Sequence, residues 1–124
     1  MDANDFIDAL RRLEADGDVE PLARMFADDG VLENPSSGAG HFVGPDGARR
    51  FWSEDRGLFG EVRSEFRNVL QTDDRAAMEW TRHGTRDGGE EISLSGVSLL
   101  ELRDGRIARF AAYFDTRELP RELG

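Results

Sequence analysis

One carboxylate, Asp115, stands where it could transfer a proton. It comes directly after the apolar run Ala112-Tyr113-Phe114, at the end of the last predicted strand. An apolar cavity raises the pKa of a carboxyl group toward neutrality, and such a group can act as a general acid or base. A strand-end aspartate can equally cap the following turn or pair with an arginine. The position therefore predicts either a catalytic carboxylate or a structural one.

Trp80 and Arg82 are two residues apart on a predicted strand, so their side chains share one face of a sheet. If that face points inward, Arg82 could pair with Asp115 and hold it ionised. Alternatively, Trp80 is a core residue and Arg82 lies at the rim of the sheet or in a dimer contact. A shift of one residue in register would instead place Glu79, Thr81 and His83 in the cavity.

Asn34 and two histidines are weaker candidates. The amide of Asn34 could hold a substrate oxygen or a water, or it could simply turn the chain before Pro35. His83 could carry a proton near neutral pH, and His41 could flank the mouth of a cavity. The two histidines are too far apart in the sequence for the spacing that is typical of metal ligands. We therefore predict no metal site and no cofactor.

Aromatic side chains would supply the walls of such a cavity. Most are expected in the core, and a few, including Trp52, Phe66 and Tyr113, are predicted to contact a ligand. A cavity with aromatic walls favours a flat, apolar small molecule.

Composition excludes several classes of partner. The formal net charge of −10 argues against nucleic acids and anionic membranes, which bind basic surfaces. No apolar run approaches the roughly 20 residues of a membrane span. The start of the chain lacks the basic and apolar segments of a secretory signal, so a cytoplasmic protein is expected. There is no cysteine, hence no disulfide and no thiolate nucleophile.

Hydrophobic periodicity predicts helices first and strands afterwards. Helical spacing covers about 4–15, a second helix starts at Asp18 and stops at 28–30, and a third starts at 45–47. A short strand is expected at 31–34 and a loop at 35–44, which is rich in Ser, Gly and Pro. Alternation then predicts long strands at 62–70, 76–86, 92–102 and 106–115, with Asp-Gly turns between the later ones.

This order predicts an α+β fold in a single domain, residues 1–124. Three N-terminal helices would pack on a mostly antiparallel sheet. Strands of about ten residues twist, and the sheet would curl into a cone-shaped α+β barrel with a mouth. The outer sheet face, carrying Ser93, Ser95, Val97 and Leu99, could bury against a second copy, which predicts a homodimer.

The chain resembles the nuclear transport factor 2-like superfamily, and within it the SnoaL-like branch. The last hairpin, from Leu99 to Ile107 and then Ala112-Tyr113-Phe114-Asp115, carries the strongest similarity. Segments Ala15–Asp18, Met25–Asp29 and Glu33–Pro35 resemble the first half. This scaffold hosts isomerases, cyclases, hydrolases and non-catalytic binders, so the resemblance is specific for fold and not for function.

The resemblance also implies roles for individual positions. An aspartate at the place of Asp115 is catalytic in SnoaL-like cyclases and also serves in the limonene epoxide hydrolase branch. Asn34 matches an asparagine that holds oxygen in that branch, but Leu32 stands where the branch has a tyrosine. Trp80 and Arg82 stand where it has arginine and then aspartate, so its Asp–Arg–Asp arrangement is incomplete here.

Two functions follow from these patterns. The first is an isomerase, cyclase or hydrolase that needs no cofactor and acts on a hydrophobic polyketide, terpenoid or steroid-like molecule, with Asp115 as general acid or base. The second is a non-catalytic module that binds a ligand or only dimerises. A ketosteroid isomerase of the usual mechanism is not expected, because its base would fall at Asn34 and its donors near Leu10 and Ser98.

Overall fold

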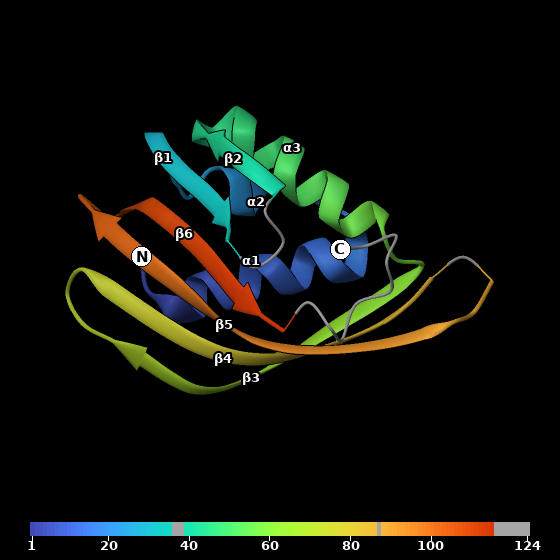
Figure 1. Cartoon of the computed structure of the whole chain (residues 1–124). Coiled ribbons are helices and arrows are strands. Elements are labelled where there is room, and N and C mark those ends of the chain that lie inside the picture. Colours follow the sequence, from blue (N-terminus) through green and yellow to red (C-terminus); the bar gives the residue numbers. More distant parts are fainter. Residues whose placement is uncertain (36–38, 87, 116–124) are drawn as a thin grey trace.

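The computed structural model describes residues 1–35, 39–86 and 88–115. Within them the chain forms three helices and six strands (Figure 1). They are α1 (Ala3–Asp16), α2 (Glu20–Ala23), β1 (Phe26–Asn34), β2 (Ala39–Val43), α3 (Gly44–Gly57), β3 (Glu61–Gln71), β4 (Arg75–Thr85), β5 (Glu91–Arg103) and β6 (Arg106–Phe114). None of these helices is long and apolar enough to cross a membrane.

The strands form one curved, unclosed sheet in the order β2-β1-β6-β5-β4-β3. All neighbouring strands are antiparallel except β1 and β6, which are parallel. The long strands β3, β4 and β5 bend beneath α1, while β1, β2 and α3 close over the opposite side (Figure 1). The predicted α+β class, with three N-terminal helices on a curved and mostly antiparallel sheet, is confirmed.

Helix α1 has clear signals at both ends. The backbone N–H of Asp5 donates to Asp2 Oδ1 at 3.0 Å, and the N–H of Asp2 donates to Asp5 Oδ2 at 2.9 Å, which forms a capping box. Gly17 ends the helix with φ of 74°, a left-handed conformation that favours glycine. These caps set the position of Glu14 in the last turn.

Two predictions for the first half of the chain are wrong. The second helix is only Glu20–Ala23, because Phe26 already pairs with Ile107 and the Ile107 N–H donates to Met25 O at 2.8 Å. Strand pairing thus overrides the helical spacing of this segment. Part of the predicted loop at 35–44 is strand β2, which pairs with β1, and residues 36–38 lie outside the described residues.

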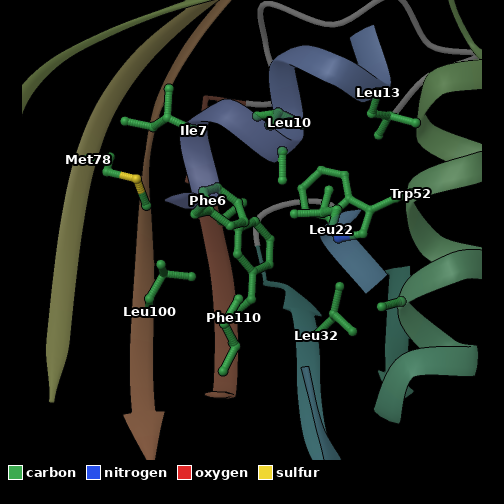
Figure 2. Packing of buried hydrophobic residues seen from close by; sticks show 14 of the residues in the cluster. Phe6, Ile7, Leu10, Leu13, Leu22, Leu32, Trp52, Met78, Leu100 and Phe110 are labelled. Carbon is green, nitrogen blue, oxygen red and sulfur yellow. The ribbon is translucent and has the colours of Figure 1, made fainter. Parts of the chain in front are cut away.

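The concave face of the sheet can be described as rows of cross-strand neighbours. One row contains Ala76, Leu100, Phe110 and Leu32, and it belongs to the core. Above this row, Phe6 from α1 and Trp52 from α3 approach Phe110, with ring centroids 5.7 and 5.1 Å away (Figure 2). This aromatic contact joins both long helices to the sheet.

Candidate functional site

A cavity of about 110 Å³ lies between the concave face of the sheet and helices α1 and α3. Its apolar lining is Phe6, Leu10, Phe51, Trp52, Leu58, Phe59, Phe66, Trp80, Leu94, Phe110, Ala112 and Phe114. Its polar lining is Asn34, Asp55, Ser64, Arg82 and Ser98. Leu58 is 44% exposed although it lines the cavity, which places the mouth near the end of α3.

The polar end of the cavity is built around Arg82. Its Nη1 lies 2.7 Å from Asp55 Oδ2 and donates to Asp55 Oδ1 at 2.9 Å. Its Nε lies 3.6 Å from Glu14 Oε2, close enough for an ion pair. Glu14 also accepts hydrogen bonds from the Ser64 backbone N–H at 3.2 Å and the Ser64 hydroxyl at 2.5 Å. Four elements, α1, α3, β3 and β4, therefore meet in one ionic cluster.

This cluster is shielded from solvent. The side chains of Arg82, Glu14 and Asp55 are 13%, 5% and 22% exposed. Burial alone would lower the pKa of Arg82, but the charge and hydrogen bond of Asp55, and then the charge of Glu14, raise that pKa above its ordinary value. Arg82 is therefore a permanent cation between two carboxylates.

The aromatic ring of Phe59 covers the guanidinium of Arg82, whose Cζ lies 5.1 Å from the ring centroid. The ring can approach β4 this closely because Gly84 has no side chain. A Cβ on Gly84 would lie 2.8 Å from Phe59 Cε1 and even closer to Cδ1. The end of α3 is thus packed directly onto the strand that carries Arg82.

Comparison with known proteins fits this architecture. A family model described as a SnoaL-like domain matches residues 3–110. This chain belongs to the SnoaL-like domain family. A search of curated proteins found no match.

Several solved structures are similar to this SnoaL-like domain. TerC, co-crystallized with polyporic acid, is 26% identical, with a TM-score of 0.76 and coverage of 90% of each chain. An NTF2-like protein from Anabaena variabilis is 17% identical, with a TM-score of 0.80 and coverage of 90% of this chain and 85% of that one. A putative SnoaL-like polyketide cyclase from Jannaschia is 16% identical, with a TM-score of 0.73 and coverage of 92% and 88%. At such identities the last two establish the fold alone.

Five of the residues singled out from the sequence come together in the SnoaL-like cavity. They are Asn34, Trp52, Phe66, Trp80 and Arg82. The register therefore turns Trp80 and Arg82 inward, and not the alternative set of Glu79, Thr81 and His83.

The other candidates lie elsewhere. Leu32 is fully buried in the core beside Phe110. Tyr113 is 41% exposed, and its hydroxyl lies 3.5 Å from Arg109 Nη2 on the outer face. His83 lines a separate polar hollow, where its Nε2 lies 3.5 Å from Glu65 Oε1, and His41 is exposed on β2.

Asp115 directly follows β6, the last strand, and its catalytic role stays a prediction. It is half-buried and directly follows Phe114, which lines the cavity, but it is not among the described residues that do so. Arg82, the arginine predicted as its partner, forms its ion pairs with Glu14 and Asp55. Among the residues that the structure describes, the carboxylate that lines the cavity is Asp55.

Two acidic residues of this site were missed by the sequence analysis, although the sequence contains a signal for each. Glu14 follows Ile7 by seven residues and Leu10 by four, so it shares the apolar face of α1. Asp55 follows Trp52 by three residues and lies on the inner face of α3. An acidic residue at an apolar helix position is unusual and could have marked both.

In the part of the chain that the structure describes, no cluster of three or more His, Asp or Glu side chains could hold a metal ion.

Proposed function

We propose that this SnoaL-like domain binds a compact hydrophobic molecule bearing a carbonyl or similar oxygen group and converts it by proton transfer through its own side chains. The observation that carries the proposal is the Glu14–Arg82–Asp55 cluster at the wall of a largely apolar cavity. Burying charge is costly, and such clusters in clefts are concentrated at functional sites. TerC, a relative at 26% identity, was co-crystallized with the organic molecule polyporic acid, which supports a small-molecule pocket.

The size of the cavity restricts the ligand. Pockets for drug-sized molecules usually have roughly 300–1,000 Å³, whereas this one has about 110 Å³. A volume of this order accommodates about one six-membered ring. The ligand would therefore be a small terpenoid or polyketide, or a larger molecule that inserts one ring and leaves the rest at the mouth near Leu58.

Asp55 is the best-placed general base. It lines the cavity, and the hydrogen bond that Arg82 Nη1 donates to its Oδ1 at 2.9 Å fixes its orientation. With an unsaturated ketone it would take a proton from the carbon between the carbonyl and the C=C bond, leaving a dienolate. Returning that proton at the far carbon of the former double bond moves the C=C bond next to the carbonyl, which is an isomerisation. The hydroxyl of Ser98 and the amide of Asn34 are further polar groups in the cavity that can orient the oxygen. The same base would serve a cyclisation or an addition of water.

Asp115, the acid or base expected from the sequence, is the competing candidate. It adjoins the cavity-lining Phe114, from where it could serve at the mouth. Comparing Asp55→Asn with Asp115→Asn separates the two roles.

Deuterium exchange of small cyclic ketones, such as 2-tetralone and cyclohexanone, tests the proposed chemistry. Nuclear magnetic resonance would follow deuterium uptake next to the carbonyl. We expect Asp55→Asn to slow the catalysed exchange by about 100-fold or more, the usual contribution of a general base. Ser53→Ala, an exposed change on α3, should leave it unchanged. If Asp55→Asn exchanges deuterium at the full rate and Asp115→Asn does not, the general base is Asp115 and not Asp55.

A binding module without turnover is the second candidate function. It is favoured by the ion pairs of Glu14 and Asp55 with Arg82, because carboxylate oxygens that contact an arginine are less available to a substrate. In that case the ketones bind to the wild-type protein, but exchange stays at the uncatalysed rate.

We also propose that the outer face of the sheet forms a homodimer. Exposed apolar side chains occur there, among them Leu70, Leu99 and Tyr113. Leu70 and Leu99 line a shallow groove together with Ala77 and with polar residues such as Arg109. Dimerisation would cover these side chains and leave the cavity on the other face open.

A further inference from the structure

The side chain of Trp80 is held in one place on the concave face of the sheet. Trp80 on β4 pairs with Gly96 on β5, and Gly96 pairs with Phe114 on β6. The indole lies against Gly96, since a Cβ added there would be 2.7 Å from Trp80 Cζ2 and 2.9 Å from Cη2. The ring therefore occupies the space that the missing side chain of Gly96 leaves.

A hydrogen bond fixes the same ring at its polar edge. The indole Nε1–H of Trp80 donates to Ser98 Oγ at 2.9 Å. Both residues are buried, with exposed fractions of 8% for Trp80 and 5% for Ser98. The ring of Phe114 lies beyond, with its centroid 6.2 Å from that of Trp80. A buried indole with its N–H satisfied and its rim packed has little freedom to move.

Trp80 also lies between the apolar and the polar parts of the cavity. One row of cross-strand neighbours contains Phe66, Trp80, Gly96 and Phe114. The next row along the strands contains Ser64, Arg82 and Leu94. On the other side of the Trp80 row, the next row contains Met78, Ser98 and Ala112. A ligand that reaches Arg82 from the core side must therefore lie on or beside the indole.

The geometry points to Trp80 as the residue that sets the size of the ligand. With the indole over Gly96, the cavity has room for about one ring. A smaller residue at position 80 leaves the hollow over Gly96 open to the cavity, because no other side chain originates there. This inference rests on the proposed function, since it assigns the specificity of that same cavity.

The test compares phenol, with one ring, and 2-naphthol, with two, by titration calorimetry on the full chain. Wild-type protein should bind phenol and discriminate against 2-naphthol. Trp80→Leu should raise the affinity for 2-naphthol about tenfold or more, the range that one or two methylene-sized groups contribute to discrimination. Trp80→Phe should give a smaller gain, and it keeps the test valid if the leucine variant does not fold. Circular dichroism verifies folding.

Two further variants make the test specific. Trp52→Leu removes the same atoms from the helical wall, where the rings of Phe6, Phe51 and Phe110 lie 4.9–6.2 Å from it. The space over Gly96 stays filled by Trp80 in this variant. Trp52→Leu should not favour 2-naphthol. Ser98→Ala releases the indole without removing it, and it should weaken the discrimination partly.

The outcomes separate the two proposals. If wild-type protein binds phenol and 2-naphthol equally well, or if Trp52→Leu gains as much as Trp80→Leu, the role of Trp80 is refuted and the pocket function stands. If neither wild-type protein nor any variant binds either probe, the proposed function is refuted, and the inference with it.

Discussion

At the scale of single residues, the buried cluster of Glu14, Arg82 and Asp55 has a large desolvation cost. Two carboxylates and one guanidinium are largely removed from water, and each loses hydration worth several kcal/mol. Their mutual attraction and the Ser64 hydrogen bonds to Glu14 offset this cost. Apolar residues of similar volume would stabilise the fold at least as well. The cluster is therefore better explained by the chemistry of the cavity than by stability.

Replacing Arg82 by Met should destabilise the protein strongly. Glu14 and Asp55 would then be buried carboxylates without a counter-ion, which typically costs about 3–5 kcal/mol. Arg63→Met breaks the exposed pair with Glu65 and should cost less than about 1 kcal/mol. Urea denaturation at neutral pH measures the free energy of unfolding of both variants. Equally small decreases in this free energy for Arg82→Met and Arg63→Met would contradict the burial of the cluster.

The pH dependence of the same variant gives a second prediction. The wild-type cluster raises the pKa of Arg82, so the cation and its stabilising effect persist at every pH below the ordinary arginine value. In Arg82→Met the two carboxyl groups stay buried without a counter-ion, and burial disfavours a charged group more than a neutral one. The penalty is therefore greatest where the charged form would prevail. The stability deficit should shrink as pH falls from 8 to 5. A deficit that does not change with pH would show that the lost free energy comes from packing and not from charge.

Part of this site was predictable from residue types, and part was not. Alternation along one strand correctly grouped Trp80 with Arg82, because the two-residue period of a strand is strict. The ion-pair partners of Arg82 come from positions 14 and 55, and Ser64 in turn donates to Glu14. No local pattern indicates which distant residues will meet. Asp115 was singled out from its place at a strand end. That place does not determine whether a side chain turns into the cavity.

At the scale of elements, the important junction is between the end of α3 and β4. Arg56 donates from Nη1 to Phe59 O at 2.8 Å and from Nη2 to Gly60 O at 3.2 Å, which fixes the chain as it leaves the helix. Phe59 then packs between Gly84 and the guanidinium of Arg82. This junction connects the mouth of the cavity to its charged end.

Gly84→Ala should disturb that junction. The new methyl group would lie less than 3 Å from the ring of Phe59, so the ring must shift away from Gly84, which disturbs its contact with Arg82. Overpacking of this kind typically costs about 1–3 kcal/mol. Gly57→Ala is the matched control, because it has open space around it, and it should be neutral or slightly stabilising. Thermal unfolding of the two variants measures the difference, and a Gly84→Ala protein as stable as the wild type would refute the close packing.

The elements themselves were predicted unevenly. The four long strands were anticipated because each alternates over about ten residues and ends at a turn signal. Strand β2 and the first half of β1 were missed, because their pairing with partners elsewhere in the sheet outweighs a Gly-rich or helical local pattern. Local propensity decides the long periodic segments, and tertiary pairing decides the short ones.

At the scale of the whole molecule, the curved sheet has two faces with different roles. Its concave face, beneath the helices, holds the core and the cavity. Its outer face has no helix over it in the described residues (Figure 1) and carries Leu70 and Leu99, which are 67% and 36% exposed. A dimer with two-fold symmetry brings the same patch of each copy together, so an exposed apolar side chain in this patch is buried in both copies.

Leu99→Arg should convert the proposed dimer into a monomer. An arginine near the centre of a two-fold interface meets its own copy, and like charges that lose their hydration repel each other. Leu58→Arg is the matched control, because this leucine is similarly exposed but lies at the mouth of the cavity on the helical side. Sedimentation should show twice the mass of the chain for wild-type protein and Leu58→Arg, and a single chain for Leu99→Arg. A monomeric wild-type protein at micromolar concentration would rule out the dimer, while a Leu99→Arg protein that remains dimeric would place the interface on another surface.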